Sequence, residues 1–284
     1  MSVALVTDST ASLSPETTSA RGITVVPLQV VIGAAAYDEG VEGGVTPEML
    51  ADALREWTPV STSRPNPEAM LEVYERLAAD GVTEIVSVHL SAELSGTFES
   101  AQLAARRSPV PVVCVDSRQV GIGTGFAVLS AADALAAGAD AAGAAEAARV
   151  RAAGTTSLFY VDTLEYLRRG GRMGAAAALV GSALAVKPIL KVEDGRVGPF
   201  ERVRTSTKAL SRLEELAVEA AAVGEVDVAV AHLASHERAS ELAGRLQGRL
   251  SDQLGGRAVE VGEIGAVLGA HVGPGMVAVC VAPR

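Results

Sequence analysis

The sequence predicts an α/β protein in which a doubly wound, mostly parallel sheet domain precedes a second, smaller α/β domain. Hydrophobic residues make up 49% of the 284 positions and charged residues 20%, which is enough apolar material for packed cores. In the first half, short β-branched runs alternate with amphipathic segments, a pattern typical of parallel strands covered by helices on both faces. The pattern changes after Gly154, so we expect domains at residues 1–155 and 156–284.

In the first half, each expected strand is a short apolar run and the expected helices lie between these runs. Pro67 can occupy the first position of a helix, and Asn66 can cap it. We expect strands at residues 3–7, 25–31, 84–88 and 110–115, and helices at residues 15–20, 47–56, 67–79, 95–105 and 120–137.

In the second half, two apolar segments flank the turn-forming group Glu193-Asp194-Gly195, so residues 187–203 are expected to form a hairpin. We expect the other strands at residues 158–161, 226–231 and 276–281, and helices at residues 164–169, 206–223 and 237–254.

Polar residues follow the strands of the first half. The groups are Asp8-Ser9-Thr10, Thr62-Ser63, residues 91–97 and Asp116-Ser117. Ligands of doubly wound sheets bind beyond the carboxyl ends of the strands, so several of these hydroxyls are expected to converge on one crevice.

The net charge of −10 argues against non-specific binding to nucleic acid, but it is distributed unevenly. Residues 168–212 hold ten basic and three acidic side chains, a net charge of +7 against −17 for the rest of the chain. This segment is either a solvated face or a docking face for an anionic partner.

Other features of the sequence exclude several classes of protein. The apolar run at residues 174–186 is too short to cross a bilayer of about 30 Å. The first residues contain no basic leader, which favours a cytoplasmic location. Cys114 and Cys280 lie in apolar β-like runs, so we expect neither a disulfide framework nor a zinc site.

The motifs that could carry chemistry are ambiguous one by one. Ser95 opens a helix, so it is either the helix cap or, with Gly96 beside it, part of a carboxylate or phosphate seat. The sequence GIGTG at residues 121–125 matches a dinucleotide loop only in part. His271 precedes a Gly-Pro-Gly bend, which would fix the direction of its imidazole. GxSxG, a P-loop lysine motif and histidines at metal spacing are all missing from the sequence, and we expect no cofactor and no metal.

An ordered set of motifs resembles the DegV family of fatty-acid-binding proteins. The motifs are DSTASL (8–13), TSRP (62–65), LSGTFESA (94–101), DTLEYLRRGGRM (162–173), KPIL (187–190) and HVGPG (271–275). The resemblance implies a Rossmann-like N-terminal domain beside a smaller α/β domain, with one long-chain fatty acid between them. It also implies a protein that does no chemistry itself and carries the acyl chain for a separate ATP-binding subunit of bacterial fatty acid kinase.

The resemblance assigns roles to individual residues. It places the carboxylate on Thr62, Ser95 and His271, with help from the N–H groups of Ser63 and Gly96, which favours the anion seat over the cap for Ser95. Arg64 departs from the glutamine that the family often has. Apolar residues near the crevice motifs are candidates for the acyl-chain lining: Ile122, Phe126, Leu164, Ile189 and Ile264. Arg172, Arg202, Arg204 and Lys208 would face the kinase subunit or an anionic membrane surface.

Two other functions remain open at this point. An acyl hydrolase would use Ser95 as nucleophile and His271 as base, although no acidic residue is obviously available to orient the histidine. A nucleotide-binding regulator would use the GIGTG segment.

Overall fold

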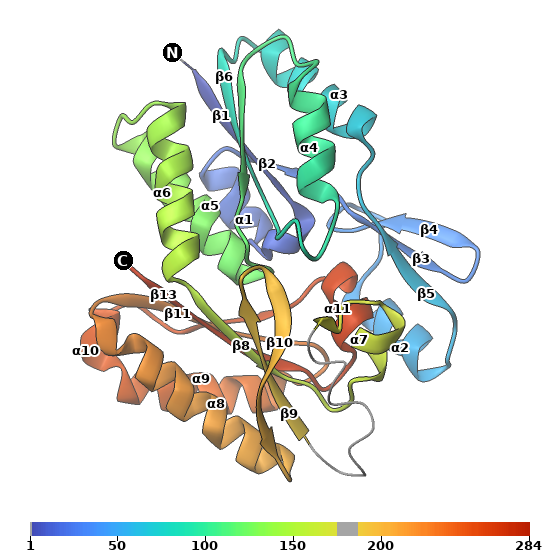
Figure 1. Ribbon diagram of the computed structural model, residues 1–284, viewed down its shortest axis with the longest axis vertical. Helices are drawn as coiled ribbons and strands as arrows, with labels where there is room; N and C mark the ends of the chain where they lie inside the picture. The colour runs from blue at the N-terminus through green and yellow to red at the C-terminus, as the bar shows by residue number, and fades with distance from the viewer. Residues whose placement is uncertain (1, 175–186) are drawn as a thin grey trace.

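The computed structural model describes residues 2–174 and 187–284, so the apolar run at residues 174–186 lies outside it apart from Gly174. Its first half contains a four-stranded sheet in the order β2-β1-β6-β7, in which every pairing is parallel (Figure 1). The strands are β1 (Val3–Asp8), β2 (Ile23–Val26), β6 (Glu84–His89) and β7 (Val112–Asp116). The predicted parallel sheet is therefore confirmed.

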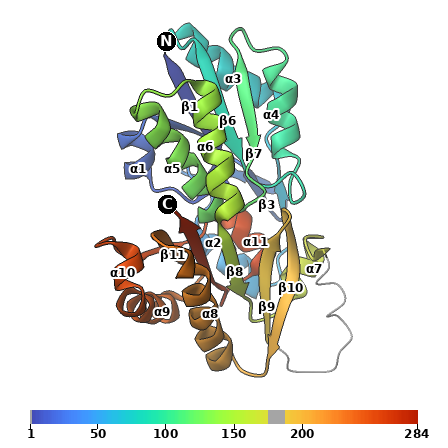
Figure 2. The ribbon, with the colours of Figure 1, turned by 60° about the vertical axis from the view of Figure 1, so that its left-hand side comes forward.

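Helices cover both faces of this sheet because its strands are apolar on both sides. Leu5 and Val86 pack with one pair of helices, whereas their neighbours Val6 and Ile85 pack with the other pair. The first pair is α5 (Ile122–Ala136) and α6 (Ala141–Gly154), which lie side by side in Figure 2. The second pair is α3 (Pro67–Ala79) and α4 (Thr97–Ala105), and the short α1 (Pro15–Ala20) leads into β2. Helix α6 was not predicted, because its alanine-rich sequence has no apolar period.

The second half forms a six-stranded sheet in the order β10-β9-β8-β13-β11-β12. Its strands are β8 (Thr156–Tyr160), β9 (Lys187–Glu193), β10 (Arg196–Val203), β11 (Val226–His232), β12 (Glu260–Glu263) and β13 (Val277–Pro283). The β9-β10 hairpin turns at Asp194 and Gly195, as predicted, and both residues have positive φ. Strand β12 was not predicted, because all four of its residues are exposed and no alternation marks it.

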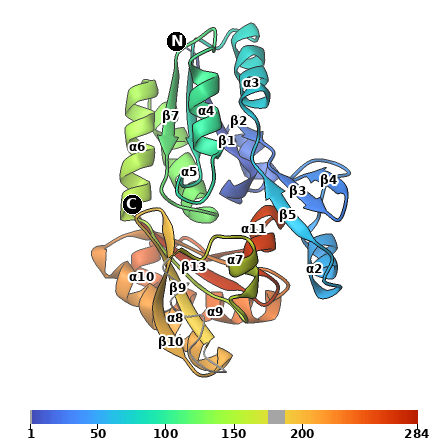
Figure 3. The same ribbon diagram turned by 45° about the vertical axis from the view of Figure 1, so that its right-hand side comes forward.

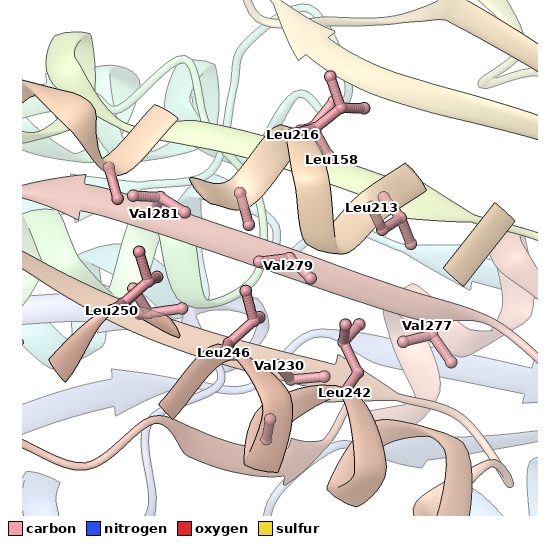
Figure 4. Packing of buried hydrophobic residues seen from close by; sticks show 14 of the residues in the cluster. Leu158, Leu213, Leu216, Val230, Leu242, Leu246, Leu250, Val277, Val279 and Val281 are labelled. Carbon is pink, nitrogen blue, oxygen red and sulfur yellow. The ribbon is translucent and has the colours of Figure 1, made fainter. Parts of the chain in front are cut away.

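One face of this sheet is covered by α8 (Ser206–Ala220) and α9 (His236–Arg249), followed by the short α10 (Ser251–Leu254). Leucines of the two long helices lie over Val277, Val279 and Val281 of β13 (Figure 4). Residues of alternate parity on the same strand, such as Ala278 and Cys280, face the other side. The sheet therefore has one face in a dry core and the other available for a cavity.

A small antiparallel sheet, β4-β3-β5, joins the two larger ones. It consists of β3 (Gln29–Ile32), β4 (Ala35–Asp38) and β5 (Val60–Ser63), and α2 (Pro47–Arg55) lies between β4 and β5 in sequence. The single strand predicted at residues 25–31 is wrong: β2 ends at Val26 and β3 begins at Gln29 in another sheet. Pro27, which has no N–H to donate to a ladder, stands at the crossing.

The small sheet shares its core with the second half of the chain. Leu28, Val30 and Leu50 belong to the same buried cluster as Phe159 and Leu190. Helix α11 (Ala266–Val272) lies against α2, β3, β5 and α7 (Glu165–Arg169), as Figure 3 shows. The division at residue 155 stays a prediction, since this core contains residues from both sides of it. In the described part of the chain, no helix has the length and apolar composition needed to span a bilayer.

A buried polar network links β1 to β6. Asp8 Oδ2 contacts His89 Nδ1 at 2.9 Å, His89 Nε2 contacts Ser87 Oγ at 2.7 Å, and Ser87 Oγ contacts the Tyr74 hydroxyl at 2.8 Å. Asp8 also accepts hydrogen bonds from the N–H groups of Thr10 and Leu90. These contacts fix the start of the loop that follows β6.

Candidate ligand-binding site

A cavity of about 500 Å³ lies where the parallel sheet, the small sheet and the open face of the six-stranded sheet meet. Its polar residues come from β5 and the residue after it, from the loop before α4, from the segment after α7 and from α11, and most of the remaining lining is apolar. The polar members include Thr62, Ser63, Arg64, Ser95, Gly96, Arg172 and His271. Of the polar groups predicted to converge, Thr62 and Ser63 of β5 and Ser95 line the cavity, whereas Asp8-Ser9-Thr10 and Asp116-Ser117 do not.

Thr62 and His271 meet across the cavity although 209 positions separate them in the sequence. Thr62 Oγ1 lies 2.9 Å from His271 Nε2. Thr62 pairs with Val30 in the small sheet, and His271 occupies the last turn of α11. Gly170 makes room for the imidazole, because a Cβ atom there would lie 2.1 Å from His271 Nδ1.

The imidazole of His271 is neutral, and its environment determines which nitrogen carries the proton. Burial, together with the charge of Arg172, lowers the pKa of His271 to about 4. Its Nδ1 atom is buried and has no hydrogen-bond partner among the residues that the structure describes. A proton on Nδ1 would therefore be an unsatisfied buried donor, so we assign the proton to Nε2, which donates to Thr62 Oγ1. The Thr62 hydroxyl is then free to donate its own proton into the cavity.

Ser95 stands just before α4, whose first residue is Thr97 and whose N-cap residue is Gly96. Its Oγ lies 2.9 Å from Thr97 Oγ1 and accepts the Thr97 N–H at 3.3 Å. The hydroxyl therefore serves the end of the helix and also lines the cavity. The two alternatives for Ser95 are not exclusive, because a hydroxyl that accepts from a backbone N–H still has a proton to donate.

Two arginines lie at the polar end of the cavity. Arg64 Nη1 donates to the carbonyl of Gly96 at 3.0 Å and to Glu99 Oε2 at 2.8 Å. Gly96 permits this crossing, because a Cβ atom there would lie 1.9 Å from Arg64 Nη1. Arg172 donates to the carbonyls of Leu94 and Gly170 at 3.1 and 2.6 Å.

The structure separates Arg172 from the other arginines of the expected docking face. Arg172 is partly buried and lines the cavity, whereas Arg202 on β10, Arg204 just after it and Lys208 on α8 are exposed. This difference could not be predicted from the sequence, because all four residues lie in the same basic segment.

Of the five residues expected to line the apolar part, Ile122 and Ile264 line the cavity. The other three expectations need correction. Ile189 points to the α8-α9 core, because residues of opposite parity on β9, such as Val192, face the cavity. Phe126 packs against residues of β11 and β13. Leu164, at the start of α7, packs on the neighbouring core without reaching the cavity wall.

Period-two alternation could have identified lining residues that the sequence reasoning missed. On β8 and β13, the residues facing away from α8 and α9 include Phe159, Ala278 and Cys280, and all three line the cavity. Leu90, Leu94 and Leu268 also line it, but they lie outside strands and carry no such signal.

The GIGTG segment has a packing role. A Cβ atom at Gly125 would lie 2.5 Å from the carbonyl oxygen of Ala11, and one at Gly123 would lie 2.9 Å from Ser157 Oγ. The glycines therefore let α5 approach the short 3-10 helix η1 (Ser9–Ala11) and β8. This accounts for them without a nucleotide.

Glu39 connects the small sheet to the helix that carries His271. Its Oε1 accepts the N–H of Val267 in the first turn of α11 at 2.7 Å. Burial raises the pKa of the Glu39 carboxyl above its usual range. A Cβ atom on Gly265 would collide with this carboxylate.

The whole described chain matches a known family. The family model described as "Uncharacterised protein, DegV family" matches residues 2–284. The chain belongs to the DegV family. A DegV domain-containing protein of Streptomyces coelicolor is 53% identical over 283 residues, which is 99% of each chain. A DegV domain-containing protein of Deinococcus radiodurans is 38% identical over 288 residues.

Solved DegV structures share the fold over the full length. The crystal structure of DegV from Bacillus subtilis, a fatty-acid-binding protein, superposes with a TM-score of 0.90 at 32% identity and covers 100% of both chains. A DegV family protein from Thermus thermophilus, described by its fatty acid binding, gives a TM-score of 0.88, also at 32% identity and full coverage. The two-domain α/β fold expected from the DegV motifs is therefore confirmed.

Proposed function

We propose that this protein binds one long-chain fatty acid in the cavity, with the carboxylate at the polar end formed by Thr62, Ser95 and His271. Thr62 and Ser95 donate to the carboxylate, and His271 orients the Thr62 hydroxyl. The observation that carries the proposal is the contact between Thr62 and His271, 2.9 Å long, at the polar end of a largely apolar cavity that Ser95 also lines. The fatty-acid-binding DegV proteins of similar fold and 32% identity support the ligand class.

The hydrogen bonds of the polar end suit a carboxylate. A carboxylate only accepts hydrogen bonds, so each hydroxyl that holds it must donate its proton. The Nε2–H of His271 donates to Thr62 Oγ1, which orients the Thr62 proton toward the ligand, and Ser95 supplies a second hydroxyl proton. The guanidinium of Arg172 adds positive charge nearby, as its effect on the pKa of His271 indicates. Together these groups offset the desolvation of an anion in an apolar cavity.

The apolar part would supply most of the affinity. Leu90, Phe159, Val192 and Ala278 line it from several elements, and each buried methylene contributes about 0.8 kcal/mol.

The hydrolase alternative has less support from the geometry. His271 Nε2 pairs with Thr62 Oγ1, while Ser95 Oγ pairs with Thr97 Oγ1. A nucleophile and its base need a mutual hydrogen bond, and no such bond joins Ser95 to His271 among the described contacts.

We test the ligand by lipid extraction and native mass spectrometry of the purified protein, followed by titration with palmitate. The variants T62A and S95A should each weaken palmitate binding by about 1–3 kcal/mol, or roughly 5- to 150-fold. Ser61→Ala is the matched control, since Ser61 is the exposed neighbour of Thr62 on β5. A protein that is free of lipid and takes up no palmitate would end the proposal.

We also propose that the bound acyl chain is presented to a separate ATP-binding kinase subunit. The exposed cations Arg202, Arg204 and Lys208 would contact that subunit. Arg204→Glu should leave palmitate affinity unchanged and lower acyl-phosphate formation in the presence of a kinase subunit. Arg76→Glu, an exposed position on α3, is the control. Loss of palmitate binding in R204E, or equal effects of both reversals on turnover, would contradict the proposal.

A further inference from the structure

A second cleft adjoins the cavity at its far end. It has a volume of about 690 Å³ and lies between the segment around α1, helix α5, and strands β11 and β12. Ile122, Ala231 and Ile264 line both the cavity and this cleft. These three side chains are therefore the wall between the two spaces, and we call them the partition.

The partition lies away from the polar end. Helix α11 extends from Ala266 to Val272, with His271 in its last turn and Ile264 two residues before its first. At about 1.5 Å per residue, Ala266 and His271 are about 8 Å apart along the helix axis, and Ile264 precedes the end of the helix opposite to the imidazole. An acyl chain that starts at His271 and follows α11 therefore meets the partition with its tail.

The second cleft can receive a hydrocarbon near the partition and opens to solvent beyond it. Leu13, Leu129 and Ala229 line it together with the partition. Its outer part is formed by exposed residues, including Glu16 and Glu260. Apolar residues therefore line the spaces on both sides of the partition.

Resting on the proposed function, we propose that Ile122 and Ile264 set the longest acyl chain that this protein accepts. The cleft behind them is the place where the end of a longer chain lies once the partition is reduced. Each methylene buried before the partition strengthens binding about fourfold, and methylenes beyond it add nothing because the isoleucines occupy their path.

The test is a titration of palmitic, stearic, arachidic and behenic acids, which differ successively by two methylenes. In the wild type, affinity should rise along the series and then fall at one member. In Ile122→Ala, the fall in affinity should occur at an acid at least one step longer in the series. The affinity for the acid at which the wild type first shows the fall should rise tenfold or more. Ile122 is partly exposed, which favours folding of this variant, and Ile264→Val is a milder second variant with the same expected direction.

Two controls separate this effect from general loosening. Ile189→Val removes the same methyl group as Ile264→Val, from a buried isoleucine in the α8-α9 core, and should leave the limit unchanged. Thr17 lines the second cleft and does not line the cavity, so Thr17→Trp added to Ile122→Ala should obstruct the cleft and restore the wild-type limit.

The outcomes distinguish this inference from the proposed function. Binding of palmitate with a chain-length limit that neither partition variant moves would overturn the inference and leave the function standing. A limit that moves equally in Ile189→Val, or that Thr17→Trp fails to restore, would also overturn it. Failure of the wild type to bind any member would overturn the function itself.

Discussion

Two buried or partly buried histidines of this chain, His89 and His271, differ in how many of their ring nitrogens have a hydrogen-bond partner. His89 is completely buried and both of its ring nitrogens have partners, Asp8 on one side and Ser87 on the other. His271 lines a cavity and has Thr62 as the partner of Nε2, whereas its Nδ1 atom has no partner within residues 2–174 and 187–284. A polar network with every member satisfied stabilises a core, whereas one with hydroxyl protons still to donate at a cavity is suited to a ligand.

The comparison also shows that residue types and their hydrogen bonds do not by themselves identify a catalytic site. Asp8, His89 and Ser87 are connected in the order of a hydrolytic triad, yet all three side chains are fully buried. Ser87 Oγ is further engaged by the Tyr74 hydroxyl. No substrate can reach this serine, so the set has a structural role.

The largest effect is expected from breaking the His89 network. Asp8→Ala leaves His89 and the N–H groups of Thr10 and Leu90 without an acceptor in the core. Because several buried donors then lose their acceptor, we expect a loss of about 3–5 kcal/mol of unfolding free energy, to be measured by urea denaturation. Asp8→Asn, which keeps an acceptor oxygen, should lose less.

Asp133→Ala is the control for this prediction, because it breaks the exposed ion pair between Arg21 and Asp133 and should cost below about 1 kcal/mol. Similar losses for Asp8→Ala and Asp133→Ala would mean that the buried network adds no stability.

A smaller effect is expected from the pH dependence that His271 confers. Its pKa is about 4 in the folded chain and 6.5 ordinarily, so between these values the unfolded chain binds a proton that the folded chain does not. Stability should therefore fall as the pH drops from about 6.5 to 4, by about 3 kcal/mol in total.

His271→Gln should remove this slope, and the difference between the two urea midpoint profiles isolates it. Glu39 contributes in the opposite sense, since its raised pKa favours the folded state at low pH, but it is present in both proteins. Parallel profiles for wild type and variant would show that His271 is not held neutral.

The sequence predicted the fold better than the site. The parallel sheet followed from apolar runs with β-branched residues, and the β9-β10 hairpin followed from Asp194-Gly195. The strand split at Pro27 was missed, because a run of apolar residues looks the same whether it pairs in one sheet or crosses between two.

The site depends on contacts that local patterns do not encode. Nothing in the residues alone pairs Thr62 with His271, and only the resemblance to the DegV motifs brought them together before the structure did. Ile189 was assigned to the lining without applying the alternation along β9, and Arg172 was grouped with its basic neighbours by sequence. The Ile189 prediction is wrong because the direction of a side chain, and not its proximity in the chain, decides which space it lines. The contact of Arg172 with a partner stays a prediction.

The smallest effect is expected at Glu39. Its carboxylate accepts a backbone N–H of α11, just as Asp8 accepts the N–H of Leu90 in the loop after β6. Glu39→Ala removes the acceptor of the Val267 N–H and so loosens the helix that carries His271. Palmitate affinity should fall by about 1 kcal/mol, or roughly fivefold, by isothermal titration. Glu39→Gln keeps an acceptor oxygen without a buried charge and should retain affinity within about twofold.

A general loss of stability would not make Glu39→Ala bind palmitate more weakly than Glu39→Gln. Ile189→Val is the control for such a loss, since it weakens the α8-α9 core. If Glu39→Gln lost as much affinity as Glu39→Ala, the charge rather than the hydrogen bond would hold α11. If Ile189→Val lost as much, the position of α11 would not limit binding. Suppose that palmitate affinity is retained in Glu39→Gln and Ile189→Val and falls in Glu39→Ala. The hydrogen bond from Val267 to Glu39, which lies outside the cavity, would then be shown to hold His271 in its position inside the cavity.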